Sequence, residues 1–426
     1  MAATQLHDWV NGDAAFEFLS LDMPVLRKYP PRKALSAVTV MGWTAPLPAS
    51  VVPRWRSLRN PIDREPSMRK SISKFETVTT VGLDLAKNVM QVHAVDAAGN
   101  VVVNKPIRRG KLIAFFAALP KCLVGMEACS SAHHWGRQIA ELGHDARLMP
   151  PAYVKAYVRR GKNDKVDAAA CCEAVGRPSM RFVPLRSVEN QAELMRHRAR
   201  EMLSSQRVAL LNALRGHLAE IGVIAPQGAQ NAYYLKKLAE TGHDENGEVL
   251  VPDGVRQSLA PLARQIDAID AEIAAIDKIL VKQAKSDPTA RRLATIPGIG
   301  PVGATAFTAT VLNVKAFANG REFSASLGLP PRQHSSGGKP RLGGISKMGD
   351  RYLRKLLVVG ATAVLRHADG HNDALRGWAK ELLARKNGPY KKKIAAVALA
   401  NKLARIVYAI LSSGGTYDDR PVRARA

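Results

Sequence analysis

The chain reads TVTTVGLDLA at residues 77–86, a β-branched and apolar run that is typical of a buried strand. Residues 88–96 then alternate between apolar and polar side chains, and the turn residues at 97–100 lead into a third extended run at 101–107. This order predicts a hairpin or meander. A further apolar run, LVGMEA at 123–128, predicts another buried strand.

Helical patterns lie between and after these strands. The sequence predicts a short helix at 111–120 and a longer one at 131–143. Another strand is expected at 145–151, and a helix at 163–175, whose first residue is a plausible N-cap. Because strands alternate with helices, we expect residues 76–187 to form an α/β domain.

The next segment, residues 188–290, carries helical patterns throughout. Within it, apolar residues recur at alternating steps of four and three, as at the a and d positions of a coiled coil. The residues of this seam are Leu262, Ile266, Ile269, Ile273, Ile276 and Leu280. The seam indicates a coiled coil between chains or, as the alternative, a core-facing helix of a bundle.

The last segment, residues 291–415, is punctuated by glycine and mostly helical in pattern. IPGIGPVG at 296–303 resembles a helix-hairpin-helix turn, which could hold a phosphate on backbone N–H groups. A tight interhelical turn is the alternative. GLPPRQHSSGGKPRLGGISKMG at 328–349 is expected to be a long polar loop, and amphipathic helices are expected at 350–367 and 391–411.

The charge of the chain indicates its class of partner. Sixty-three Lys and Arg stand against 36 Asp and Glu, a net charge of +27. This excess favours a polyanion, because each neutralised phosphate releases counterions. An anionic membrane surface is the alternative. No apolar run reaches the roughly 18 residues of a membrane span, and the 4 cysteines form no CxxC pair. We therefore expect a cytoplasmic protein, associated with the nucleoid, without zinc or disulfides.

Residues 1–70 differ from the rest of the chain. They show no sustained helical or strand period, and they contain fragments such as PRK, PLP and NPIDREP. We expect a poorly ordered and dispensable extension, with Met68 as an alternative start of the protein. A basic arm that binds nucleic acid is the functional alternative.

Four acidic residues stand out by position, namely Asp84, Glu127, Asp164 and Asp167. The first interrupts an apolar strand and the second ends another, where a buried charge is costly unless it is offset. The other two lie three apart, so one helical face presents both. If all four meet at one edge of a sheet, their repulsion would be offset by Mg²⁺, which prefers oxygen ligands. Paired Mg²⁺ ions support phosphodiester chemistry.

Each acid also has a simpler interpretation when it is taken alone. Asp164 and Asp167 could be first-turn acids that the helix dipole favours. Asp84 could cap a strand end, and Glu127 could pair with a lysine. Their combined placement on a strand, strand and helix scaffold in a strongly basic chain favours the metal site.

Several segments resemble a known family. VGLDLAKNVMQVHAVD, GMEACSSAHHWG and KNDKVDA are similar to the three acidic blocks of the DEDD-type transposases of bacterial insertion sequences. GLPPRQHSSGGKPRLGGISKMGDRYLRKLLVVGA is similar to the C-terminal block of the same family. The resemblance covers residues 76–415 in order and spacing, whereas residues 1–70 have no counterpart.

The resemblance implies a domain of the ribonuclease H and Holliday-junction-resolvase type, with metal bound by Asp84, Glu127, Asp164 and Asp167. It also implies a C-terminal transposase domain with a nucleophilic serine in the motif Gly-Leu-x-Pro-Arg-x-x-x-Ser-Gly. That motif places the serine at Ser336, with Ser335 as the alternative. Members of the family are similar in using a structured RNA of their own element to bridge donor and target DNA. They act as multimers joined partly through a coiled coil, so a dimer or tetramer is expected.

Cations flank the serine and suit phosphate oxygens; they are Arg332, Lys339, Arg341, Lys347, Arg351 and Arg354. A flexible Ser/Gly linker is the alternative for this loop. The sequence as a whole predicts an RNA-guided, Mg²⁺-dependent transposase or recombinase acting on double-stranded DNA. Two alternatives stay open: a resolvase-like nuclease in which a metal-activated water attacks, and a catalytically inactive protein that binds nucleic acid.

Overall fold

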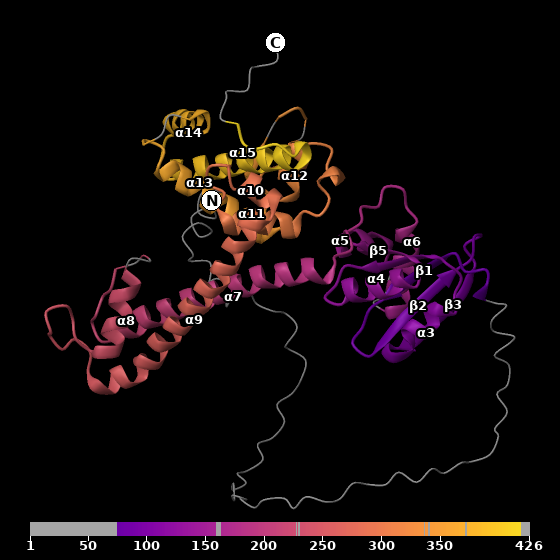
Figure 1. Cartoon of the computed structure of the whole chain (residues 1–426), viewed down its shortest axis with the longest axis horizontal. Coiled ribbons are helices and arrows are strands. Elements are labelled where there is room, and N and C mark those ends of the chain that lie inside the picture. Colours follow the sequence, from indigo (N-terminus) through magenta and orange to yellow (C-terminus); the bar gives the residue numbers. More distant parts are fainter. Residues whose placement is uncertain are drawn as a thin grey trace, which may run out of the picture. The chain divides into compact units, whose positions relative to one another are not determined.

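The computed structural model describes residues 75–158, 163–226, 228, 231–335, 337–339, 341–370 and 373–418. These residues fall into two compact units, divided in the chain between Leu185 and Arg186. The N-terminal unit contains a β-sheet, and the C-terminal unit is mostly helical (Figure 1). The extension expected at 1–70 and the residue Ser336 lie outside the described residues.

The N-terminal unit is built on a five-stranded sheet in the order β3-β2-β1-β4-β5. Its strands are β1 (Thr80–Asp84), β2 (Val89–Val95), β3 (Val101–Arg108), β4 (Leu123–Glu127) and β5 (Asp145–Met149). The first three pair antiparallel, as the meander predicted, and β4 and β5 extend the sheet in parallel with β1. The α/β class predicted for this region is confirmed.

Helices cover the sheet and enclose its core. Helices α3 (Leu112–Ala117) and α4 (Ala132–Glu141) bury Phe116 and Trp135 against Val81, Leu83 and Met126 of the strands. Because side chains alternate along a strand, the residues between these point to the opposite face. Helix α6 (Asp164–Val175) lies on that opposite face, against β1 and β4.

Two glycines allow α6 to lie close to the sheet. Gly82 and Gly125 are register partners on β1 and β4. A Cβ on Gly82 would lie 2.0 Å from the carbonyl oxygen of Ala168, and one on Gly125 would lie 2.5 Å from the Cβ of Val175. No side chain fits at either position, so helix and sheet meet almost backbone to backbone.

Replacing Gly82 with alanine is expected to destabilise the N-terminal unit by about 2–3 kcal/mol, because the added methyl meets a backbone carbonyl that cannot move aside. Urea unfolding, followed by hydrogen exchange of the strand amides, measures the change. Gly176→Ala is the matched control, since a Cβ there meets no atom within 4 Å. Equal stability of the two variants would contradict this account of how α6 packs.

The C-terminal unit begins with a long helical hairpin. Its helices are α7 (Val188–Glu220), α8 (Ala232–Thr241) and α9 (Asp253–Ser286). Arg200 pairs with Asp277 at 2.5 Å, and Arg207 pairs with Asp270. From the first ion pair to the second, the residue number rises by seven on α7 and falls by seven on α9. The two helices are therefore antiparallel, and their contacts repeat with a heptad spacing.

The predicted apolar seam lies on α9 and is partly covered by the chain itself. Ile266 and Leu280 are fully buried, and Ile269 is 6% exposed. Ile266 belongs to a core shared with Leu214 of α7 and Leu235 of α8. For these residues the structure has the core-facing arrangement that was the alternative to a coiled coil between chains.

The rest of the unit packs around α13 (Arg351–Arg366) and α15 (Lys391–Ser413). The other elements are α10 (Pro288–Leu293), α11 (Pro301–Thr310), the 3-10 helix η6 (Val314–Ala316), α12 (Gly320–Ser326), β6 (Pro331–Gln333), β7 (Leu342–Ile345) and α14 (Ala374–Ala384). Among the described residues, α15 alone is long and apolar enough to cross a membrane. Its Leu399, Leu403 and Val407 are buried in the core of this unit, as in a core helix.

Candidate active site and nucleic-acid interface

The four acidic residues gather where the parallel strands end and α6 begins. Asp84 and Glu127 are the last residues of β1 and β4. Each follows a glycine that faces α6 by two positions, so both carboxylates emerge on the α6 face. Asp164 and Asp167 lie in the first turn of α6, which Asn163 caps by accepting a hydrogen bond from the N–H of Lys165 at 3.0 Å.

The carboxylates are close enough to change one another's ionisation. Burial raises the pKa of Asp84, and the charges of Asp164 and Asp167 raise it further. Burial likewise raises the pKa of Glu127, with further contributions from Asp84 and Asp167. Concentrated negative charge of this kind disfavours the ionised forms unless a cation is bound.

The four acids offer carboxylate oxygens as metal ligands, and these are the ligands that Mg²⁺ prefers. Within the described ranges, no three His, Cys, Asp or Glu side chains are yet arranged around a common metal position. The backbone positions and the raised pKa values of Asp84 and Glu127 fit a divalent-cation site.

Gln91 is a neighbour of this edge that the sequence analysis missed. It lies directly across from Asp84 in the β1–β2 register and is 5% exposed. Its Nε2 donates to Oδ1 of Asn104 at 2.7 Å. The signal was present in the sequence, because Gln91 and His93 alternate with the buried Met90 and Val92 and so had to face α6.

The segment predicted as a long polar loop is instead a β-hairpin. Strands β6 and β7 pair antiparallel, with Pro331 opposite Ile345 and Gln333 opposite Leu342. We call residues 328–349 the serine hairpin. Near its end, the N–H of His334 donates to the carbonyl of Arg341 at 2.9 Å, and the N–H of Arg341 donates to Oγ of Ser335 at 3.1 Å. The hydroxyl of Ser335 therefore helps to close the hairpin.

Most of the predicted phosphate-binding cations are exposed on this hairpin and at the start of α13. The exposed residues are Arg332, Lys339, Arg341, Lys347 and Arg351. Arg354 is the exception and corrects the sequence-based expectation, because it is only 3% exposed. It lies on the core-facing side of α13 with Leu353 and Leu357, and its Nη1 donates to the carbonyl of Leu327 at 2.7 Å.

The glycine-rich turn at 296–303 joins α10 to α11. Gly298 has φ of 86°, and a Cβ there would lie 2.8 Å from the carbonyl oxygen of Gly360 on α13. This packing explains Gly298 by close helix contact, as in the tight interhelical turn. Gly300 and Pro301, at the start of α11, are exposed.

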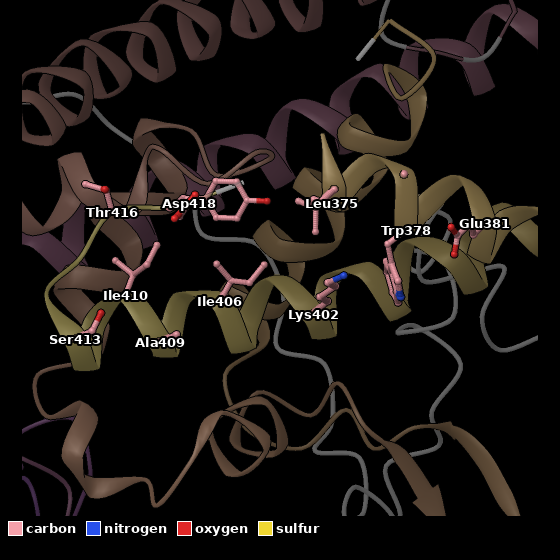
Figure 2. A pocket seen from close by; sticks show the side chains of 13 residues that line it. Leu375, Trp378, Glu381, Lys402, Ile406, Ala409, Ile410, Ser413, Thr416 and Asp418 are labelled. Carbon is pink, nitrogen blue, oxygen red and sulfur yellow. The ribbon is translucent and has the colours of Figure 1, made fainter. Parts of the chain in front are cut away.

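A cavity of about 680 Å³ lies between α14, α15 and residues 416–418 (Figure 2). Its walls include Leu375, Ile406 and Ile410, and the Nζ of Lys402 lies 4.2 Å from the centre of the Trp378 ring system. The lining contains neither the four acids nor the serine hairpin, so the predicted chemistry is not located there.

Comparison with known proteins identifies the family. Residues 290–376 match the Transposase IS116/IS110/IS902 family, and residues 81–223 match a DEDD-type transposase domain. A family 20 transposase of Pseudomonas aeruginosa is 44% identical over 340 residues, which are 80% of this chain and 98% of that protein. The chain belongs to the IS110 family of transposases.

Two further relatives are named as transposases of particular insertion sequences. That of element IS1328 from Yersinia enterocolitica is 37% identical over 80% of this chain and 98% of its own length. That of element IS1111A from Coxiella burnetii is 36% identical over 82% of this chain and 94% of its own length. The IS110-family chain is thus a DNA transposase, and its DEDD-type domain implies a divalent metal.

Proposed function

We propose that this IS110-family transposase cuts and rejoins DNA with Ser336 as the nucleophile and with Mg²⁺ held by Asp84, Glu127, Asp164 and Asp167. The observation that carries the proposal is the common placement of the four acids where β1 and β4 end and α6 begins. We also propose that the N-terminal unit is a resolvase-like domain; its five-stranded sheet with acids at the ends of β1 and β4 and at the start of α6 supports this.

A serine hydroxyl is a weak nucleophile until it loses its proton. In the proposed step, the Ser336 hydroxyl gives up its proton and its oxygen forms a bond to a DNA phosphorus, while the bond from that phosphorus to a strand oxygen breaks and that oxygen leaves as a hydroxyl by taking up a proton. The exposed cations of the serine hairpin hold the phosphate oxygens. Mg²⁺ would supply stabilisation of the developing negative charge. Rejoining reverses the step with an oxygen of another strand.

The chain is proposed to have four functional parts. Residues 1–70 are an extension, 76–187 the DEDD domain, 188–290 a helical connection and 291–415 the transposase domain with the serine hairpin. The proposed partners are double-stranded DNA at the element ends and target, together with a structured guide RNA. Both are polyanions that suit the net charge of +27. Cytoplasmic action at the nucleoid follows from these partners.

The guide RNA has a direct test. Ribonuclease treatment of the purified protein is expected to abolish recombination, and the RNA that copurifies with the protein should restore it, because target choice would rest on base pairing. An unrelated RNA of equal length is the control. Undiminished recombination of a defined target after complete RNA removal would contradict RNA guidance.

A resolvase-like nuclease remains the second candidate function, because the acidic edge needs no serine to activate a water.

A homo-oligomer is proposed in either case. The surface that supports it lies on α7, where exposed small and apolar residues repeat at steps of four and three from Val188 to Met202, with Ala209 one heptad further on. We call it the α7 stripe; its residues are Val188, Ala192, Met195, Ala199, Met202 and Ala209. Val188, Met195 and Met202 are each about 60% exposed.

The double substitution Met195→Asp with Met202→Asp is expected to reduce the oligomer to a smaller species. In an interface, both carboxylates would be buried without a partner, whereas in the free chain they are solvated. Light scattering measures the mass, and Ile224→Asp is the control, since Ile224 is 79% exposed and lies outside the stripe. A double variant with wild-type mass would place the interface elsewhere.

A further inference from the structure

The serine hairpin joins the core at a narrow base. A Cβ on Gly328 would lie 2.1 Å from the carbonyl oxygen of Met348, and one on Gly349 would lie 1.7 Å from that of Ser326. Both glycines have positive φ, 71° and 85°. The segments that enter and leave the hairpin therefore touch through their backbones, with no room for a side chain between them.

Two backbone hydrogen bonds cross this base. The N–H of Ser346 donates to the carbonyl of Pro330 at 2.8 Å, and that of Lys347 donates to the carbonyl of Gly328 at 3.1 Å. Among the described residues, Lys347 alone has a positive φ without being glycine, at 56°. A positive φ at a residue other than glycine persists only where the surrounding contacts impose it. We therefore expect a side chain to hold the two segments of the base together.

Arg354 is the side chain that bridges the two segments from inside. Its Nη1 donates to the carbonyl of Leu327 at 2.7 Å and to that of Met348 at 3.3 Å, one on each side of the base. The same nitrogen would lie 2.9 Å from a Cβ on Gly328. The guanidinium is only 3% exposed, so it cannot reach DNA without a rearrangement of the base.

We propose that Arg354 is the positioning residue of the serine hairpin, a buried cation that clamps the carbonyls of Leu327 and Met348 and so fixes the direction in which β6 and β7 leave the core of the C-terminal unit. The proposal rests on the function proposed above for Ser336. Glutamine is shorter and uncharged, so its amide would not reach the two carbonyls that Nη1 of Arg354 contacts, and the charge-assisted hydrogen bonds would be lost. The hairpin would then remain attached but lose its fixed orientation.

The experiment uses the full chain with Arg354→Gln, Arg354→Lys and the control Arg351→Gln, whose arginine is exposed one turn earlier on α13. In Arg354→Gln, amide exchange at Ser346 and Lys347 is expected to rise about tenfold. Strand transfer should fall about 100-fold, as for a misplaced reacting group, while DNA affinity stays unchanged. Arg354→Lys keeps the charge and a donor nitrogen, so it should recover part of both losses.

The control should behave in the opposite way, with weaker DNA binding and unchanged exchange at both amides. Unchanged exchange in folded Arg354→Gln would overturn the proposal. So would a loss of DNA affinity equal to the loss of rate, because it would make Arg354 a direct phosphate contact. If Arg354→Gln does not fold, Arg354→Lys decides, and wild-type exchange in that variant would overturn it.

Failure of the serine mechanism would look different. If Ser336 is not the nucleophile, Ser336→Ala recombines DNA normally, yet exchange at Ser346 and Lys347 still rises in the Arg354 variants. The exchange experiment therefore tests the clamp, and the Ser336 variant tests the chemistry that the clamp serves.

Discussion

Asp84→Asn is expected to reduce strand transfer at least about 1,000-fold while DNA binding remains. The substitution removes one anionic metal ligand and changes the side-chain volume little. Asp84 ends β1 beside α6, where its carboxylate interacts with Asp164 and Asp167, so it contributes to a shared site. Glu127→Gln should have a similar effect, because Glu127 ends the neighbouring strand on the same face.

The matched control is Asp145→Asn, which changes an exposed acid at the opposite end of a parallel strand in the same sheet. It pairs with Arg147 at 2.6 Å and should leave strand transfer near the wild-type rate. Wild-type activity of Asp84→Asn in Mg²⁺ would remove Asp84 from the metal site.

The thermal stability of Asp84→Asn distinguishes a loss of catalysis from a loss of folding. The pKa of Asp84 is raised in the folded protein, so its ionised form opposes folding at pH values above that pKa, and the cost disappears below the unfolded pKa. Asparagine carries no charge and removes this cost. In metal-free buffer near neutral pH, the Tm of Asp84→Asn should therefore equal or exceed that of the wild type, and the difference should narrow towards about pH 4.

Ser336→Ala is expected to abolish the recombinant product while RNA and DNA binding persist. The change removes a single hydroxyl, and the binding energy comes from exposed cations such as Arg332 and Arg341. Ser335→Ala is the control one residue away. The hydroxyl oxygen of Ser335 accepts a hydrogen bond from the N–H of Arg341, so this variant should lose some hairpin order and keep part of the activity.

The sequence was sufficient to predict much of the N-terminal unit. A β-branched apolar run predicted β1, a second apolar run predicted β4, and the capping residue Asn163 predicted the start of α6, all of which the structure confirms. The close approach of α6 depends on Gly82 and Gly125 being register partners. The register between strands that are distant in sequence depends on the tertiary fold. The sequence could therefore suggest that the acids lie close together, but it could not establish it.

The C-terminal unit shows where pattern reading fails. The strands of the serine hairpin are short and contain Pro331, Gly343 and Gly344, which are poor strand formers. Arg354 was grouped with its basic neighbours, although it shares the apolar spacing of Val358 and Ala361 on α13 and could have been read as buried. On α9 the seam was found, whereas the α7 stripe was overlooked because alanines make up half of it.

The most direct measurement is a denaturing gel of labelled DNA incubated with the protein in Mg²⁺, followed by mapping of any peptide that stays joined to the DNA. The account predicts a slow-migrating, protease-sensitive band in the wild type and in Ser335→Ala, attached through Ser336, and no such band in Ser336→Ala or Asp84→Asn. Free nicked DNA without an adduct, produced equally by wild type and Ser336→Ala, would contradict the account and establish attack by water.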